Sequence, residues 1–254
     1  LPVAYVPSGQ GGTTAPITLA GNVIIPLAGS LAGIVLSQLK REGAPFIMPG
    51  WAGSAIDMQT MIQPYCDPEK RGVAIDFAHY LGLPIFSLGG ASDSKLVDEQ
   101  AAAEVALTLF SEILFGGHMV HDLGYLESGQ AYSLALLVIA DEIISWLKAF
   151  AKGVEISDNT LAVDLIDTIG PDGQYIDSNH TFENFRSRWY PSLLDRGNRR
   201  LWLTKGGKSM GQRAADRVAE ILDTHKPSPL AKKSAEAVAY IVERARKRSR
   251  SQHV

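Results

Sequence analysis

The chain contains 254 residues, 46% of them hydrophobic, and carries a formal net charge of −3 at pH 7. This size and hydrophobic content suffice for one large folded domain, and the charge argues against a general attraction to nucleic acid or to an anionic membrane surface. The single cysteine, Cys66, cannot form an internal disulfide, and no charged and then apolar signal segment opens the chain, so we expect a cytoplasmic protein.

Short apolar runs alternate with longer helical patterns from residue 1 to about residue 153. Four brief runs rich in Val, Ile or Phe are predicted to be strands, at residues 2–7, 45–49, 83–88 and 118–122. Continuous apolar runs of this kind are typical of strands that are covered on both faces. The alternation therefore predicts an α/β fold in which βα units build a parallel sheet.

A polar, glycine-rich loop and then a helix follow each predicted strand. The loops occupy residues 8–14, 50–59, 89–95 and 123–130, and the helices occupy residues 18–40, 68–81, 97–115 and 131–152. All the long loops thus lie at the carboxyl ends of the strands, where α/β folds place their active sites. Four units cannot close an eight-stranded barrel. Either further units lie upstream, or a second copy supplies them, or the sheet stays open.

The first predicted helix contains the longest apolar stretch, residues 17–39. Asn22, Pro26 and Ser30 interrupt this stretch. It therefore lacks the uninterrupted apolar length of about 20 residues that a membrane span requires. We expect a buried helix and no association with a membrane.

The strand signals stop after residue 153, and residues 154–254 are predicted to form a helical C-terminal layer. Helices are expected at residues 158–169, 181–188, 207–225 and 229–248, with a turn at residues 170–173 and a helix start at residues 177–179. The chain ends in a basic tail. We interpret this tail as a solvated helix end rather than an arm that binds nucleic acid.

The richest candidate loop follows the fourth predicted strand and carries His121, Asp122, Tyr125 and Glu127. An imidazole, a phenol and two carboxylates at a strand end suit a polar site. His118 and His121 point to opposite faces of a strand, so they do not converge on one metal ion, and we expect no bound metal. The structural alternative is that His121 only satisfies backbone groups at the rim of the sheet.

The loop after the third predicted strand carries Gly89, Gly90, Asp93 and Lys95. The glycines allow a sharp turn and a close approach of a ligand to the backbone. Asp93 is a candidate ligand contact or, alternatively, a cap of the following helix, and Lys95 is a candidate contact or a lysine that faces water in the first helical turn. No Gly-Lys-Ser/Thr sequence closes the loop, so it is not a nucleotide phosphate cradle.

The first two loops provide weaker candidates. Gly11 and Gly12 in the first loop could admit a large planar ligand or its nucleotide tail. Trp51 and Met58 in the second loop either line an apolar cavity or belong to the core.

Several of these segments, in this order and spacing, resemble the trimethylamine methyltransferase family, which includes glycine betaine methyltransferase and relatives without pyrrolysine. The resemblance runs from about residue 11 to residue 225 and corresponds to the C-terminal half of a typical member. The matching stretches are residues 12–21, 43–45, 81–84, 92–95, 121–129, 141–143 and 153–156. The stretch that contains Tyr125 is the most specific of them.

The resemblance implies a TIM barrel that moves a methyl group from a methylated amine to the Co(I) centre of a corrinoid, a cobalamin carried by a separate partner protein. No pyrrolysine is written in the sequence, which favours a quaternary over a tertiary amine. Three groups of residues are assigned to this activity: catalytic His121, Asp122 and Glu127; substrate-binding Tyr125, Trp51, Asp93 and Lys95; and cofactor-facing Gly11, Gly12, Gly89 and Gly90.

Two other functions remain open. The chain begins at Leu1 in mid-strand, which indicates a partial sequence. It could be a non-catalytic half-barrel that binds a corrinoid protein or a complementary half, or it could belong to a different TIM-barrel enzyme. In each case half a barrel leaves unpaired strand groups, so we expect a homo-oligomer.

Overall fold

The computed structural model describes residues 1–50, 53–67 and 69–251 and has an α/β fold. Three parallel strands, β1 (Met48–Pro49), β2 (Ile85–Leu88) and β3 (Met119–His121), form a sheet in the order β1-β2-β3. The helix α2 (Glu69–Tyr80) connects β1 to β2, and α3 (Glu99–Phe115) connects β2 to β3. The parallel βα arrangement predicted from the sequence is thus confirmed for these units.

The first predicted strand, residues 2–7, is reduced to a single parallel bridge between Val3 and Phe46. Val3 N–H donates to the Pro45 carbonyl at 2.9 Å, and Ile47 N–H donates to the Val3 carbonyl at 2.9 Å. Prolines stand at both ends of the predicted run and cannot donate to a ladder, which explains why the pairing stops so soon. Through this bridge the segment around Val3 lies parallel to the segment that leads into β1, on the edge of the sheet away from β2.

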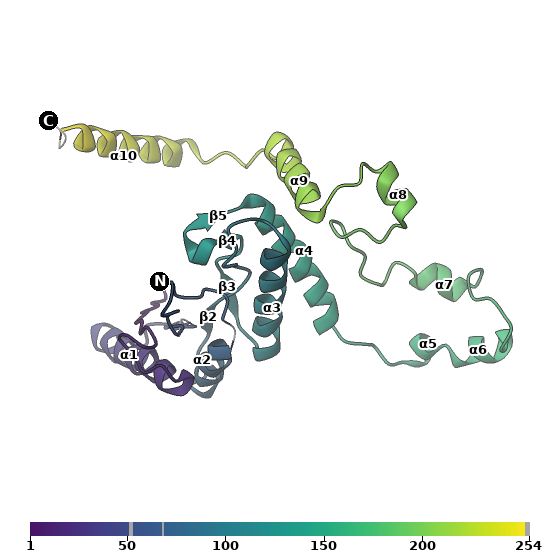
Figure 1. The fold of residues 1–254 in the computed structure, drawn as a ribbon, viewed down its shortest axis with the longest axis horizontal. Coiled ribbons are helices and arrows are strands. Elements are labelled where there is room, and N and C mark those ends of the chain that lie inside the picture. Colours follow the sequence, from purple (N-terminus) through teal and green to yellow (C-terminus); the bar gives the residue numbers. More distant parts are fainter. Residues whose placement is uncertain (51–52, 68, 252–254) are drawn as a thin grey trace. The chain divides into compact units, whose positions relative to one another are not determined.

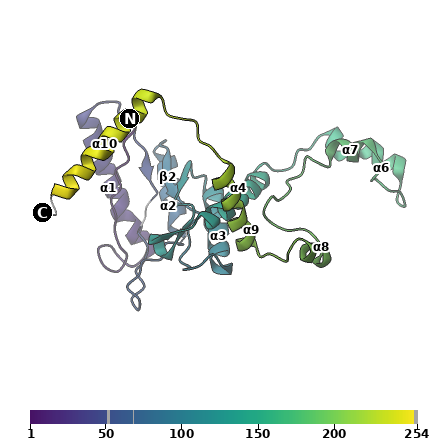
Figure 2. The same cartoon turned by 90° about the horizontal axis from the view of Figure 1, so that it is seen from above.

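Four long helices follow one another around the strands (Figures 1 and 2). They are α1 (Leu19–Lys40), α2, α3 and α4 (Leu134–Ala151), and each contacts the next in the chain. Met48 and Ile85 point from the sheet into a buried cluster with Ile75 of α2. Because side chains alternate along a strand, Phe86, Met119 and His121 lie on the opposite face of the sheet. Met119 there is 48% exposed.

The prediction of a buried first helix is wrong for most of α1. Only one stripe of this helix is buried, and it includes Asn22, Val23 and Pro26. Apolar residues of the remaining surface, Leu36 and Leu39 among them, are exposed. By its length and composition α1 could cross a membrane, but core helices of soluble proteins can be equally long and apolar. In the most apolar stretch of α1, 28% of the residues are buried.

The fourth loop and the start of α4 differ from the prediction. Residues predicted to begin the helix pair instead as strand β5 (Ala131–Tyr132), antiparallel to β4 (Tyr125–Leu126), and a short 3₁₀ helix, η1 (Glu127–Gly129), connects them. Ser133 caps α4 by accepting a hydrogen bond from the Leu136 N–H. The loop therefore has a fixed backbone of its own.

Residues after Gly153 form helices in the described part of the chain. These are α5 (Asp158–Leu161), α6 (Val163–Ile169), α7 (Asn179–Asn184), α8 (Arg199–Thr204), α9 (Met210–Thr224) and α10 (Lys232–Ser251). One helix was predicted where α5 and α6 lie, and Ala162, with φ 51°, breaks it. Ser178 caps α7 as predicted, whereas α8 was not predicted.

The carboxylate of Glu142 in α4 binds the backbone of residues 192–194, between α7 and α8. It accepts hydrogen bonds from the backbone N–H groups of Ser192, Leu193 and Leu194 and from the Ser192 hydroxyl. Leu193 is buried in the same core as α3 and α4. By its contacts the chain forms two compact units, Leu1–Val218 and Ala219–Val254. The boundary proposed at residue 153 stays a prediction.

Candidate functional site

Backbone hydrogen bonds join the loops at the carboxyl ends of the strands. Gly124 N–H donates to the Gly90 carbonyl at 2.9 Å, and Ser92 N–H donates to the Tyr125 carbonyl at 2.9 Å, so the third and fourth loops run side by side. Gly11 N–H donates to the Ser54 carbonyl at 3.1 Å and connects the first loop to the second. The loops that the sequence predicted to cluster do so.

His121, Asp122 and Tyr65 form a hydrogen-bonded group where β3 ends. His121 Nδ1 lies 2.8 Å from Asp122 Oδ1, and the Tyr65 hydroxyl donates to Asp122 Oδ2. The His121 ring stacks on Phe86 of β2, with ring centroids 3.9 Å apart and planes 13° apart. Asp122 has a φ of 70°, a backbone conformation that few residues other than glycine adopt. His121 and Asp122 were predicted site residues, whereas Tyr65 was missed.

The electrostatics of this group keep Asp122 ionised and Tyr65 protonated. Burial opposes ionisation of Asp122, but hydrogen bonds from His121 and Tyr65 and the charges of His121 and Arg71 hold the pKa of its carboxyl below the usual value. Burial raises the pKa of the Tyr65 phenol, and the hydrogen bond to Asp122 raises it further. Since an ionised carboxylate only accepts, His121 Nδ1 must carry the proton that it shares with Asp122.

Tyrosine rings surround this group. Tyr125, a predicted substrate contact, lies with its ring centroid 6.4 Å from that of Tyr65, and Tyr132 packs edge-on against Tyr125 at 5.6 Å. Trp51, the other predicted aromatic contact, lies outside the described residues. Met58 is 58% exposed, so the alternative that it belongs to the core is wrong.

Asp93 links three loops rather than capping a helix. Its carboxylate accepts hydrogen bonds from the Tyr65 N–H at 2.8 Å, the Cys66 N–H at 3.1 Å and the Ser128 hydroxyl at 2.8 Å. The cap of α3 is Asp98, whose side chain accepts from the Ala101 N–H. The capping alternative for Asp93 is therefore wrong, and direct contact of Asp93 with a substrate stays a prediction.

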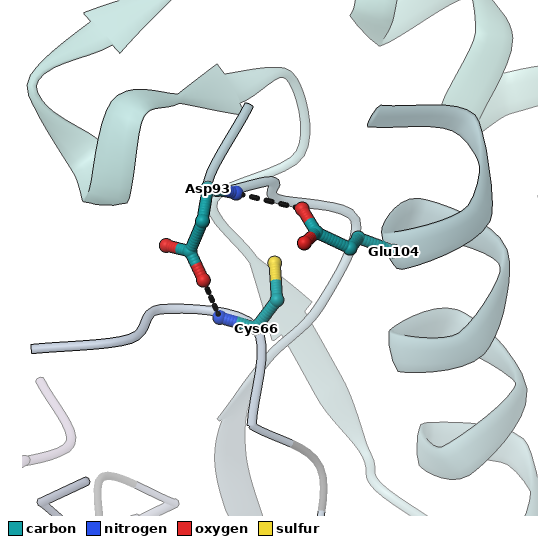
Figure 3. Close-up of side chains that lie close together, drawn as sticks. All are labelled: Cys66, Asp93 and Glu104. Atoms are coloured by element: carbon teal, nitrogen blue, oxygen red, sulfur yellow. Dashed lines mark hydrogen bonds between the residues drawn. The ribbon is translucent and has the colours of Figure 1, made fainter. Parts of the chain in front are cut away.

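Cys66, Asp93 and Glu104 bring one ligand atom each within 4.8 Å of one another, a grouping that could hold a metal ion (Figure 3). These atoms already have hydrogen-bond partners. Glu104 accepts from the Asp93 N–H at 2.8 Å, and the Cys66 thiol donates to the Ala91 carbonyl. Burial, and then the charges of Asp93 and Glu104, raise the pKa of that thiol. These hydrogen bonds connect the segment before α2 and the loop after β2 with α3, and the expectation of no bound metal stays a prediction.

A buried pair of opposite charges lies beneath the site and was not predicted. Arg71 and Glu112 are each 2% exposed. Arg71 Nη2 donates to the Tyr65 carbonyl at 3.0 Å, and Glu112 accepts from the Ser87 hydroxyl at 2.8 Å. Burial lowers the pKa of Arg71 and raises that of Glu112. The charge of each residue opposes the shift in the pKa of the other. Among the described residues, Arg71 Nη1 and Glu112 Oε2 have no hydrogen-bond partner.

The protein's own packing accounts for the four predicted cofactor-facing glycines. A Cβ at Gly11 would lie 2.7 Å from the Asn22 amide nitrogen, and one at Gly89 would lie 3.1 Å from Val120. Gly12 and Gly90 have φ values of 88° and 74°, which favour glycine. The role of these glycines toward a corrinoid stays a prediction.

Two further predicted residues lie at the exposed rim. The Lys95 ammonium donates to the Asp93 carbonyl at 2.9 Å, and the residue precedes α3 instead of standing in its first turn. Glu127 begins η1 and is exposed. In the described part of the chain no hydrogen bond joins its carboxylate to another predicted site residue, so its role stays a prediction.

Comparison with known proteins identifies the family. Residues 1–250 match the family model of trimethylamine methyltransferase (MTTB). The chain is 36% identical to trimethylamine methyltransferase MttB of Desulfitobacterium hafniense, over 96% of this chain and 49% of that protein. It is 30% identical to the Methanosarcina barkeri protein of that name (97% and 50%) and 32% identical to glycine betaine methyltransferase of D. hafniense (96% and 54%). The chain spans about half the length of these curated relatives. It belongs to the trimethylamine methyltransferase family.

Proposed function

We propose that the complete protein transfers a methyl group from a methylated amine to a corrinoid that a partner protein carries. Family membership supports methyl transfer, since relatives are named as trimethylamine and glycine betaine methyltransferases. The observation that carries the proposal is the hydrogen-bonded group of His121, Asp122 and Tyr65 at the end of β3. It lies among joined loops at the carboxyl ends of parallel strands, the usual place of an active site in such folds.

The fold proposed for the complete protein is a TIM barrel, in which residues 1–153 supply four of the eight βα units and residues 154–254 a helical layer. Two features of the chain support this. Val3 and β3 each pair on one side only within the described residues, so both edges of the sheet are open. Met119, on the face of the sheet away from α2, is half exposed. Further strands would pair with the edges and cover that face.

The proposed methyl donor is a quaternary ammonium compound. The corrinoid, when bound, supplies the Co(I) nucleophile that accepts the methyl group. A quaternary donor leaves as a neutral tertiary amine and needs no proton, so the residues of this chain have to desolvate and orient a permanent cation. The face of Tyr125 can attract such a cation by about 0.5–2 kcal/mol. The ionised Asp122 adds charge complementarity at the same place.

The remaining assignments follow from the same donor. His121 Nδ1 is engaged by Asp122, which directs the other ring nitrogen toward a ligand. We assign to His121 a hydrogen bond with the polar end of the substrate: because Nδ1–H donates to Asp122 and a substrate carboxylate only accepts, the doubly protonated ring donates this bond from Nε2–H. Glu127 and Lys95 are assigned to the rim, where their exposed charges meet substrate or partner. The protein is proposed to act in the cytoplasm.

A panel of methyl donors tests the proposal. The full-length protein is mixed with free cob(I)alamin and with quaternary or tertiary methylated amines, and formation of methylcobalamin is followed by absorbance. We expect faster transfer from a quaternary donor. A preference for trimethylamine would contradict the assigned donor. Transfer from none of the amines, together with binding of a corrinoid protein, would favour the non-catalytic alternative.

A further inference from the structure

We propose that Tyr65 is a positioning residue of this site, whose hydroxyl holds Asp122 against His121 and thereby fixes the imidazole that faces the substrate. The part that concerns substrate rests on the proposed function, whereas the hydrogen-bonded group stands on the geometry alone. Tyr65 comes from the segment between β1 and α2, far in sequence from the two residues that it would position.

Contacts that do not involve the hydroxyl hold the backbone and the ring of Tyr65. Its N–H donates to Asp93, and its carbonyl accepts from the buried Arg71 at 3.0 Å. Its ring lies against Gly129, where a Cβ would come within 3.2 Å of the ring, and its centroid is 6.4 Å from that of Tyr125. Contacts with the third loop, the fourth loop and α2 therefore hold the backbone and ring of Tyr65. Removal of the hydroxyl alone should leave the ring in place.

Within the described residues, the Tyr65 hydroxyl and His121 Nδ1 are the two side-chain donors to Asp122. His121 Nδ1 donates to Oδ1 and Tyr65 donates to Oδ2, so each carboxylate oxygen has a partner. Asp122 also stands in a left-handed conformation, with φ 70°, which its neighbours must stabilise. With Oδ2 held by Tyr65, Oδ1 stays directed at the imidazole. Phe86 fixes the ring plane from the other side.

Loss of the hydroxyl should make Asp122 easier to protonate. The groups that face this carboxylate are the His121 imidazole from β3, the Tyr65 phenol from the segment before α2 and the Arg71 guanidinium from α2. Glu112 from α3 acts on His121. An acidic group with a depressed pKa contributes fully to the stability of the folded state above its ordinary pKa. This contribution is lost as the pH falls through the depressed value. Without the phenol the depressed pKa of Asp122 lies higher, so the loss is complete at a higher pH.

The test is a titration of the Asp122 carboxyl by 13C NMR in the full-length protein, with Tyr65→Phe as the variant and Tyr132→Phe as the control. Tyr132 packs on Tyr125 and is 51% exposed. We expect the midpoint to rise by about one pH unit in Tyr65→Phe and to stay unchanged in the control. Equal midpoints in wild type and Tyr65→Phe would overturn the proposal, whether or not the protein transfers methyl groups.

Kinetics provide a second measurement. We expect Tyr65→Phe to lower kcat/KM for methyl transfer by about 10-fold and to move the acid limb of its pH profile upward. In an Asp122→Asn background the same substitution should have no further effect, and a full additional loss would overturn the proposal. If Tyr65→Phe does not fold, the 15N spectrum of the His121 ring in Asp122→Asn tests the interaction between residue 122 and the imidazole. A changed tautomer is expected, and an unchanged spectrum overturns the proposal.

Discussion

The substitution Asp93→Asn isolates the contribution of one carboxylate to the organisation of the loops. Wild-type Asp93 accepts from the N–H groups of Tyr65 and Cys66 and from the Ser128 hydroxyl. Asparagine has nearly the same shape, but one of its two terminal atoms is a donor, so one of these three donors loses its acceptor. The other two lose the strengthening that a charged acceptor gives. The expected cost is about 1.5–3 kcal/mol.

Hydrogen exchange measures this cost at the place where it arises. The amides of Tyr65 and Cys66 should exchange roughly 10- to 100-fold faster in Asp93→Asn, because that is the factor that corresponds to the lost free energy. Glu99→Gln is the matched control, since it removes one negative charge from an exposed position at the start of α3. Unchanged exchange at both amides, or an equal increase in the control, would show that Asp93 does not hold the loops.

Three further predictions follow from other parts of the chain. Glu142→Gln should speed exchange of the Leu193 amide by about 10-fold or more, whereas Asp141→Asn, its exposed neighbour, should not; equal rates would refute the anchoring role of Glu142. Cys66 should react with iodoacetamide more slowly at pH 8 than a free cysteine, because its raised pKa keeps it a thiol, and rapid alkylation would be inconsistent with this. The chain alone should associate through its open sheet edges, and light scattering from a monomer at all concentrations would count against that.

The sequence predicted the parallel order and the helices because local signals specify both. Apolar runs marked the segments around Phe46, Ile85 and Val120, and capping residues such as Ser178 marked helix starts. The antiparallel pair formed by β4 and β5 was missed because two-residue strands carry no periodicity that separates them from a helix start. The exposed surface of α1 was missed because an apolar sequence predicts burial without saying what covers it.

The candidate site was predicted only in part, for a related reason. His121, Asp122 and Tyr125 stand close together in one loop, so their clustering could be read from the sequence. Tyr65 and Arg71 join them only through tertiary contacts between a loop and a helix that are distant in sequence. A lone tyrosine in a loop and an arginine in an early helical turn both have ordinary surface roles, and nothing in their neighbourhood distinguished them.

The most direct test of the proposed site is the effect of His121→Ala on kcat/KM for methyl transfer in the full-length protein. A quaternary ammonium carboxylate is the donor and free cob(I)alamin the acceptor. His118→Ala is the control, because His118 is exposed and contacts His79 and the Ile85 N–H instead of the group of His121, Asp122 and Tyr65. We expect a loss of roughly 10- to 100-fold for His121→Ala, which corresponds to one hydrogen bond with a charged partner, and little change for His118→Ala. Wild-type kcat/KM in His121→Ala would contradict the assignment of the site.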